Sequence, residues 1–268
     1  MQASTSELYN PESLRNLHGQ DFIKALLEWE RNAYKALSPH DYREMVEYQF
    51  GLADVASAYP VYFAGDIAHP ENKEIFVGIN PGYANEKQQS NEQSYLDSRN
   101  LFEGYCEIFR DFFPRERNGL ITYYAHVTGF IRRYYGIEHP INNWPWVHEN
   151  LINLELVPYH SKTTKKFRIR NIEKYRMTQF DYFLKILTHL NPEKPIFING
   201  FPTFREYFEH PVFKDIIAFK KIEGFWVGRI AGKFRFIGVP FLQQMRIKRD
   251  PFVAHVAALT SSSSIWEF

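Results

Sequence analysis

The residues Gly78-Ile79-Asn80-Pro81-Gly82 place a polar amide in a tight turn. The turn directly follows the apolar run Ile75-Phe76-Val77, which predicts a short buried strand. Open α/β sheets bind their ligands at the carboxyl ends of such strands. Asn80 is therefore the first candidate for a catalytic side chain. The alternative is that Asn80 only caps the Pro-Gly bend, since Asn is a common turn residue.

The elements that would position this turn alternate between helix and strand. Helical patterns cover residues 12–60, 93–135 (broken at Pro114 and at 118–119) and 174–190, and strand patterns cover 75–77, 151–157, 195–199 and 234–239. Strands separated by helices predict one three-layer α/β/α domain with a central four-stranded, mostly parallel sheet. We expect a helical N-terminal extension at 1–58, the α/β domain at 59–260 and a C-terminal tail at 261–268.

Composition excludes several classes of site. The chain has 268 residues, a net charge of +1 and one cysteine, Cys106. One cysteine excludes a disulfide framework, a four-Cys zinc site and a four-Cys iron–sulfur cluster, and the histidines show no ligand spacing. No signal peptide opens the chain and no apolar run approaches the roughly 18 residues of a membrane span. We therefore expect a cytoplasmic monomer that uses no metal or other cofactor.

The five-residue turn resembles the first active-site motif of the uracil-DNA glycosylase superfamily, in its mismatch-specific branch. Three later segments resemble the family's remaining strand ends in the same order: 155–159, 196–200 and 239–244. In that family the last of these leads into a loop that enters the DNA minor groove. The resemblance covers residues 60–258 and implies a DNA substrate. Residues 1–55 and an insert at 85–145 have no counterpart.

Two departures from the family pattern concern its chemistry. The closing motif, a His or Asn followed by Pro-Ser, is replaced by Val239-Pro240-Phe241. The histidine that would stabilise the departing base is therefore missing from its expected place. The single cysteine also separates this chain from the iron–sulfur branches of the family.

The resemblance implies roles for the residues of the turn. Asn80 would position a water molecule or support the positive charge that develops on the sugar carbon as the base leaves. Gly82 stands where the strict uracil enzymes carry a tyrosine that blocks substituents at C5 of the base. Glycine leaves that side open to a 5-substituted pyrimidine, although Tyr83 could partly fill the gap. Gly78, Ile79 and Pro81 complete the base-binding turn.

Further base-binding candidates lie outside the turn. Glu155 falls where the family reads the base with an Asn; a carboxylate only accepts hydrogen bonds and so suits the N4 amine of cytosine. A structural salt bridge is the alternative for Glu155. Tyr95, Phe102 and Tyr105 are candidates to stack on a flipped base, and core packing is the alternative for each. His160 could line the same pocket, or could be a surface or capping residue.

Two segments have the composition of DNA contacts. The stretch after the second strand is basic and suits phosphate binding, with Lys162, Lys165, Lys166 and Arg168 as its main candidates. A solvated loop is the alternative. The segment after the fourth strand has the composition of a minor-groove wedge with phosphate clamps, namely Leu242, Gln243, Gln244, Arg246 and Lys248. An ordinary helix start is the alternative there.

The expected activity is that of a monofunctional DNA glycosylase, which flips a pyrimidine and leaves an abasic site. No lysine stands at the turn to form a Schiff base. Gly82 and Glu155 favour a modified cytosine, and the resemblance extends to antiphage glycosylases that attack glucosylated cytosine in viral DNA. The alternatives are a catalytically inactive DNA-binding module of the same fold and a hydrolase of nucleosides or nucleotides.

Overall fold

The chain folds into two compact units of mixed helix and strand. The computed structural model describes residues 12–79, 86–116, 119–161, 168–242 and 249–268. The first unit comprises Met1–Phe63, Asn80–Cys106 and Glu155–Asn191, and the second comprises Ala64–Ile79, Glu107–Leu154 and Pro192–Phe268. Within the described ranges, no helix has the length and apolar character needed to cross a membrane.

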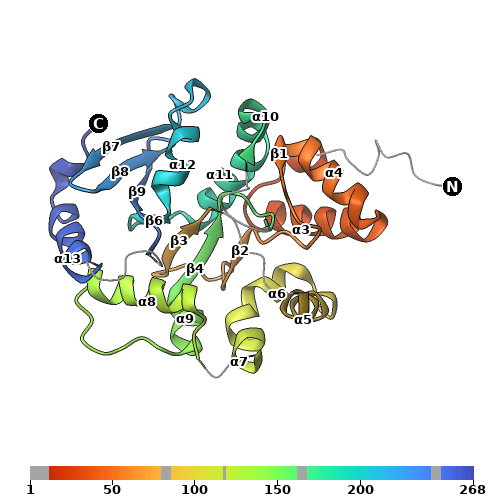
Figure 1. The fold of residues 1–268 in the computed structure, drawn as a ribbon, viewed down its shortest axis with the longest axis horizontal. Helices are drawn as coiled ribbons and strands as arrows, with labels where there is room; N and C mark the ends of the chain where they lie inside the picture. The colour runs from red at the N-terminus through yellow and green to blue at the C-terminus, as the bar shows by residue number, and fades with distance from the viewer. Residues whose placement is uncertain (1–11, 80–85, 117–118, 162–167, 243–248) are drawn as a thin grey trace. The chain divides into compact units, whose positions relative to one another are not determined.

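The second unit is built on a mixed sheet of seven strands in the order β2-β4-β3-β6-β9-β8-β7, whose β6 to β9 portion is drawn in blue shades in Figure 1. The strands are β2 (Phe63–Ala64, at the unit boundary), β3 (Glu74–Gly78), β4 (Leu151–Glu155), β6 (Ile196–Asn199), β7 (Ile217–Ile222), β8 (Phe225–Ile230) and β9 (Phe234–Val239). β3, β6 and β9 are parallel to one another, while β8 and β7 are antiparallel. The four strands predicted from the sequence are confirmed.

The predicted four-stranded sheet is wrong in its strand number because β2, β7 and β8 were not expected to belong to it. β7 and β8 form a hairpin whose strands pair from Ile217 with Ile230 to Ile222 with Phe225. Its two-residue turn, Glu223-Gly224, takes positive φ angles of 39° and 97°. The right-handed twist of paired strands favours turns with positive φ. Glu-Gly is a weaker turn signal than Asn-Gly, and the sequence IAFKKI on the outer strand is only partly apolar.

Helices cover the sheet of the second unit: η1 (Ile108–Phe112, a π-helix), α7 (Phe113–Glu116), α8 (Thr122–Tyr134), α9 (Trp144–Asn150), α12 (Phe201–Phe208), η2 (Pro211–Phe213), α13 (Arg249–Thr260) and η4 (Ser263–Trp266). α8 packs beside α13 (Figure 1). Its Phe130 ring lies 5.7 Å from Phe76 of β3 and 5.1 Å from Phe197 of β6, measured between centroids. Contrary to expectation, Pro114 does not break the helical region, because η1 continues directly into α7.

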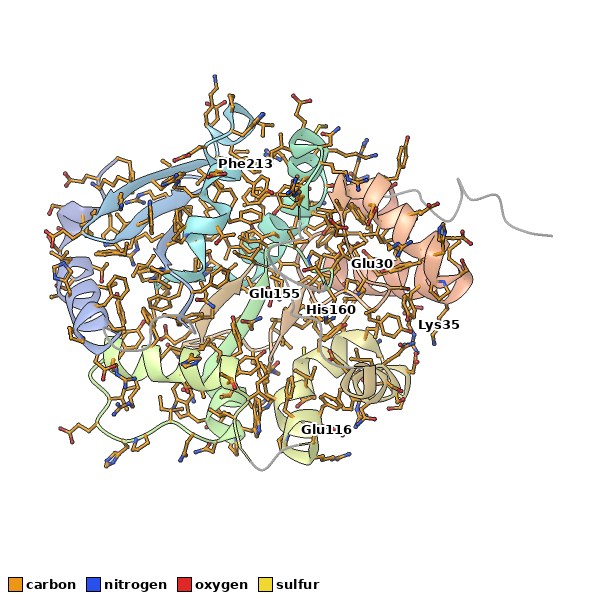
Figure 2. The ribbon with its side chains drawn as sticks, in the orientation of Figure 1. Glu30, Lys35, Glu116, Glu155, His160 and Phe213 are labelled. Atoms are coloured by element: carbon orange, nitrogen blue, oxygen red, sulfur yellow. The ribbon has the colours of Figure 1, made fainter. Side chains whose placement is uncertain are left out.

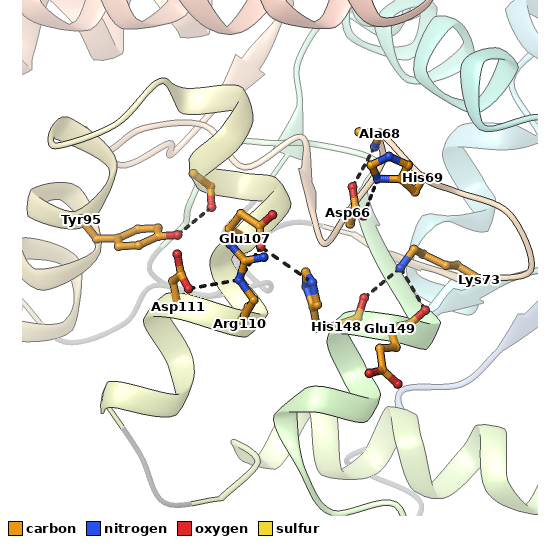
Figure 3. Close-up of polar contacts among 11 residues, drawn as sticks. Asp66, Ala68, His69, Lys73, Tyr95, Glu107, Arg110, Asp111, His148 and Glu149 are labelled. Carbon is orange, nitrogen blue, oxygen red and sulfur yellow. Dashed lines mark hydrogen bonds and ion pairs between the residues drawn. The ribbon is translucent and has the colours of Figure 1, made fainter.

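Lysines fasten the amino ends of strands in the second unit. Just before β3, Lys73 donates to the carbonyls of His148 and Glu149 at 2.9 Å, so the start of β3 is tied to the end of α9 (Figure 3). Just before β6, Lys194 pairs with the buried Glu74 carboxylate at 2.5 Å. Glu74 opens β3 and also accepts from the Tyr135 hydroxyl at 2.7 Å. All of these contacts lie at the amino edge of the sheet, opposite its carboxyl edge.

The first unit is mainly helical, as the sequence predicts for its N-terminal part. Its helices are α2 (Glu12–Arg15), α3 (Gly19–Ala36), α4 (Pro39–Phe50), α5 (Glu86–Asp97), α6 (Leu101–Glu107), α10 (Ile172–Met177) and α11 (Gln179–Leu190). The Ser38 hydroxyl caps α4 by accepting from the backbone N–H of Asp41 at 3.1 Å. The predicted single helix at 174–190 is instead two helices, because Thr178 leaves helical geometry with φ −122° and ψ −86°.

A buried carboxyl joins the separate segments of the first unit. Glu30 of α3 has no exposed surface. Its Oε1 accepts hydrogen bonds from Tyr62 at 2.7 Å and Tyr159 at 2.5 Å, and its Oε2 accepts from Tyr42 at 3.1 Å. Gln179 of α11 donates in turn toward the Tyr62 and Tyr159 hydroxyls at 3.4 and 3.5 Å. Burial raises the pKa of Glu30 from 4.5 to about 7, although the three tyrosine hydrogen bonds oppose this shift.

Candidate active site

The carboxyl edge of the second unit's sheet contains a topological switch point between β3 and β6. These adjacent parallel strands pair Phe76 with Phe197 and Val77 with Ile198. From β3 the chain goes on to β4 on one side, whereas from β6 it goes on to β9 on the other side. Connections that diverge in this way leave a crevice beyond the strand ends, which is where open α/β sheets bind ligands.

The GINPG motif begins at this point. Gly78 is the last residue of β3 and is buried, and Ile79 has only 5% of its surface exposed. The side chains on which the expected chemistry depends, Asn80, Pro81, Gly82 and Tyr83, lie outside the described residues. The location predicted for the motif, directly after a buried central strand, is therefore confirmed, while the roles of its side chains stay predictions.

The turn after β6 lies on the other side of the switch point. Buried Asn199 accepts a hydrogen bond through Oδ1 from the backbone N–H of Leu242 at 3.0 Å. The next residue, Gly200, has φ +79°, and a Cβ at this position would lie 2.3 Å from the Phe241 ring. Only glycine fits this close approach. The end of β6 therefore holds the segment that follows β9.

The wedge candidates lie on that segment. Leu242 is 1% exposed, so in this structure its side chain packs inside the protein. Its four companions, Gln243, Gln244, Arg246 and Lys248, fall outside the described residues. Entry of Leu242 into DNA would therefore require it to leave a buried position.

Glu155 and His160 lie on the segment that leaves β4, which neighbours β3 in the sheet (Figure 2). Glu155 ends β4, is 8% exposed, and its backbone N–H donates to the Tyr62 carbonyl at 3.2 Å. His160 is 7% exposed, and its carbonyl accepts from Ala56 at 2.7 Å. A surface position for His160 is therefore wrong: both side chains are buried where the first unit continues from the strand.

The three aromatic candidates are buried within the first unit. The Tyr95 hydroxyl donates to the Gly104 carbonyl, and the Arg99 guanidinium lies 4.3 Å from the Tyr95 ring centroid. Phe102 packs edge-to-face on Phe63, at 6.0 Å between centroids. Tyr105 donates to the Pro60 carbonyl at 2.8 Å. These contacts are those of core residues, the alternative that the sequence left open.

A small pocket of the first unit gathers polar groups from three segments. Its lining consists of Ser57, Ala58, Tyr59, Glu92, Gln93, Leu96 and His160. The volume open to the centre of a water molecule is about 30 Å³. Glu92 keeps some exposed surface, yet the loss of surrounding water raises its pKa from 4.5 to about 7. Strongly shifted carboxyls in pockets are frequent at functional sites.

The basic stretch is anchored at both of its described ends. Ser161 forms an antiparallel bridge with Val55, and Arg168 pairs with Ala53 where β5 (Arg168–Ile169) meets β1 (Leu52–Ala53). Arg168 is exposed. Lys162, Lys165 and Lys166 lie outside the described residues. Of the predicted phosphate contacts, the structure therefore describes only Arg168.

The sequence analysis missed Glu92 and the fastening role of Asn199. Glu92 lies in the polar helix sequence EKQQSNEQSYLD, where one carboxylate has no distinguishing spacing. Asn199 offered a signal, since a polar residue ends the apolar run Ile196-Phe197-Ile198 directly before a glycine. Its partner, the Leu242 backbone, is distant in the chain, so the contact could not be anticipated.

Among the described residues, no group of three or more His, Cys, Asp or Glu side chains is placed to hold a metal ion. Comparison of the chain with protein-family models, with curated proteins and with solved structures finds no match.

Proposed function

We propose that this protein is a monofunctional DNA glycosylase that flips a pyrimidine nucleotide and hydrolyses its N-glycosidic bond. The observation that carries the proposal is the switch point between β3 and β6, flanked by the GINPG motif and the Asn199-Gly200 turn. A catalytic amide that follows β3 would stand at the crevice where this architecture binds ligands. We further propose that this sheet is the central layer of a three-layer α/β/α domain, with helices on both of its faces.

Asn80 has the central role in this proposal. Cleavage of an N-glycosidic bond develops positive charge on the sugar carbon, and an amide oxygen aimed at that carbon stabilises it. Gly78, Ile79 and Pro81 shape the turn around the base. Water is the nucleophile and an abasic site is the product, since no lysine is present in the turn.

The proposed base is a 5-substituted cytosine, which includes glucosylated forms found in viral DNA. Gly82 adds no side chain beside C5, and the buried Glu155 carboxylate accepts from the exocyclic amine. The burial of Glu155 supports this role, because a buried carboxylate discriminates strongly between a donor and an acceptor on the base. DNA backbone contacts are assigned to Arg168 and its neighbouring lysines, and base displacement to the segment around Leu242.

The experiment is a panel of duplex and single-stranded oligonucleotides that carry uracil, mismatched thymine, 5-hydroxymethylcytosine or glucosylated 5-hydroxymethylcytosine. Alkali-induced strand breaks report abasic sites. We expect breaks with the modified cytosines, a decrease of at least about 100-fold in rate for Asn80→Ala, and no change for the exposed Asn142→Ala. Because no Schiff base forms, borohydride should trap no covalent complex.

The remaining results would contradict the proposal. Binding of DNA without strand breaks on any substrate would identify an inactive module of this fold. Release of base from free nucleosides but not from oligonucleotides would identify a nucleoside hydrolase. If the protein readily cleaved uracil DNA but left modified cytosines intact, the proposed reaction would stand and the proposed base would be wrong.

A further inference from the structure

Two large apolar side chains are strongly exposed on neighbouring helices of the first unit. Tyr48 of α4 is 79% exposed, and Met177, the last residue of α10, is 75% exposed. The other large apolar side chains exposed in the described part of the chain, Tyr135 and Phe268, belong to the second unit. One exposed apolar side chain needs no explanation, whereas a group of them on one surface is typical of an interaction site.

Lys174 of α10 places Tyr48 and Met177 on one surface. Its ammonium lies 4.0 Å from the centroid of the Tyr48 ring, so a cation covers one face of that ring. Met177 follows Lys174 by three residues, a spacing that puts both side chains on the same side of the helix. Tyr48 keeps most of its surface exposed in spite of the Lys174 contact, which leaves the other ring face open to solvent.

Backbone hydrogen bonds hold the two helices together beside this surface. The N–H groups of Arg170 and Asn171 both donate to the carbonyl of Gly51, the residue that caps the end of α4, at 2.7 and 3.1 Å. Asn171 also caps α10, because its Oδ1 accepts from the backbone N–H of Lys174 at 2.9 Å. α4 accordingly packs against both β1 and α10 (Figure 1). The ring and the ammonium are therefore carried by a fixed frame, and such preorganisation lowers the cost of binding.

The segment that faces the Tyr48 ring is positively charged. Residues 168–177 contain four cations and one acidic side chain, Glu173. The cations are Arg168, Arg170, Lys174 and Arg176. On α4, the Glu47 carboxylate offsets one of these charges, since it lies 4.0 Å from Arg170, and Glu44 lies 3.4 Å from His40. The segment therefore presents more positive than negative charge to a ligand beside the ring.

An exposed aromatic ring among cations has the chemistry that binds an unpaired nucleotide. Proteins that bind single strands stack bases on aromatic rings and contact the phosphates with basic side chains. Bases inside a duplex are covered by their neighbours, so a ring on the protein surface stacks more readily on a single strand. The core of a protein–protein interface is instead depleted of charged residues, lysine among them. The composition of this surface therefore favours nucleic acid over a protein partner.

We propose that Tyr48, Lys174 and Arg170 form a binding surface for single-stranded DNA, an inference that rests on the proposed function for the identity of the partner. One unpaired base stacks on the open face of the Tyr48 ring, and Lys174 and Arg170 contact the flanking phosphates. Met177 extends the apolar area beside the base. This surface gives a role to the N-terminal helices, to which neither the family resemblance nor the proposed function assigns one.

Two labelled probes separate base stacking from phosphate attraction: an oligothymidylate, and an oligonucleotide of the same length in which every nucleotide is abasic. Fluorescence anisotropy of the full-length protein measures both affinities. Tyr48→Ala should weaken binding of the oligothymidylate by about 5- to 150-fold, the range for loss of one stacked base, and should leave binding of the abasic strand unchanged. Tyr48→Trp, which retains an aromatic face, should keep the wild-type affinity. Lys174→Gln should weaken binding of both probes, because it removes a phosphate contact.

Phe268→Ala is the matched control. Phe268 is also an exposed aromatic residue, and the Lys220 ammonium lies 5.1 Å from its ring centroid, but it belongs to the second unit. This variant should bind both probes as the wild type does. Thermal unfolding checks that all variants are folded, which the strong exposure of Tyr48 favours.

Equal affinity of Tyr48→Ala and the wild type for the oligothymidylate would overturn the stacking role, and cleavage of the oligonucleotide panel by the wild type would then leave the glycosylase function standing. A Tyr48→Ala loss of the same size on both probes would also overturn it. If the wild type bound phosphatidylserine vesicles and neither oligonucleotide, the surface would be a membrane contact and the proposal would be wrong. Binding of the oligothymidylate through Tyr48 without any abasic product on the panel would support the surface and refute the glycosylase function.

Discussion

Glu30 and Glu92 belong to the same unit and share a pKa of about 7, but their surroundings differ. Glu30 has no exposed surface and accepts from three tyrosine hydroxyls. Glu92 lines a pocket that water can enter. The two carboxyls therefore differ in their partners: Glu30 is held by tyrosine hydroxyls, whereas Glu92 faces a small pocket.

Glu30 should make the stability of the first unit fall as pH rises. Folding raises its pKa from 4.5 to about 7, so the folded state binds the proton more tightly. The resulting stabilisation is complete below pH 4.5 and disappears as pH rises to about 7, a change on the order of 3 kcal/mol. Glu30→Gln cannot ionise and should lack this part of the pH dependence.

Urea denaturation at pH 5, 6, 7 and 8 measures this difference. The free energy of unfolding of Glu30→Gln should gain on the wild type as pH increases, while the exposed Glu28→Gln of the same helix should follow the wild type. Glu92 contributes equally to the pH dependence of unfolding in all three proteins, so its contribution cancels in the comparison. Parallel curves for the wild type and Glu30→Gln would refute the prediction.

At the scale of elements, the carboxyl edge of the sheet depends on the turn that joins β6 to α12. Asn199 and Gly200 hold the residues after β9 through one hydrogen bond and one close ring contact. The amino edge is fastened instead by Lys73 and Lys194. The two edges therefore differ. Lysine side chains hold the amino edge, whereas the carboxyl edge ends in backbone turns that can shape a binding site.

Two glycines with similar backbone angles isolate the ring contact. Gly200→Ala should cost about 2–4 kcal/mol, because a positive φ costs about 1–2 and the Cβ also meets the Phe241 ring. At Gly232, with φ +65°, a Cβ would have no atom within 4 Å, so Gly232→Ala should cost only about 1–2 kcal/mol. Chemical denaturation gives both values. Adding Phe241→Ala to Gly200→Ala should recover stability; equal costs at the two glycines would argue against the contact.

At the scale of the whole molecule, charge is nearly balanced, with 32 Lys and Arg against 31 Asp and Glu. A net charge of +1 provides little long-range attraction for DNA. Any affinity must therefore come from a local cluster, and the basic stretch after β4 is the candidate that the sequence offers. Its described flanks are held by pairing with residues 53 and 55.

Neutralising Lys165, Lys166 and Arg168 together should weaken DNA binding and flatten its salt dependence. Removal of each phosphate contact should reduce the slope of log K against log salt by about 1. The control replaces three exposed lysines of the second unit, Lys214, Lys221 and Lys233, and so makes the same change in net charge. Fluorescence anisotropy at salt concentrations from about 50 to about 200 mM provides the measurement. Equal slopes for the two triple variants would mean that the stretch is only a solvated loop.

The sequence alone determined the four strands that end in Pro, Gly or a polar residue, and the N-terminal helices, because these depend on local periodicity and on caps such as Ser38. It also determined that GINPG follows a buried strand. The β7–β8 hairpin escaped prediction because its pairing, rather than its composition, stabilises it. The break at Thr178 likewise has no Gly or Pro to mark it.

Only the tertiary structure decided which strand ends share the switch point and which carboxyls are desolvated. The sheet order arises from long-range pairing of β3 with β6, and Asn199 meets a backbone group 43 residues away in the chain. The pKa values of Glu30 and Glu92 depend on desolvation by segments that are distant in the chain. Residue type and spacing show which chemical groups are present. How far these groups are desolvated, and which hydrogen-bond partners they have, depends on how the chain packs. The motif could therefore be read from the sequence, whereas the strand neighbours of the motif and the desolvated carboxyls could not.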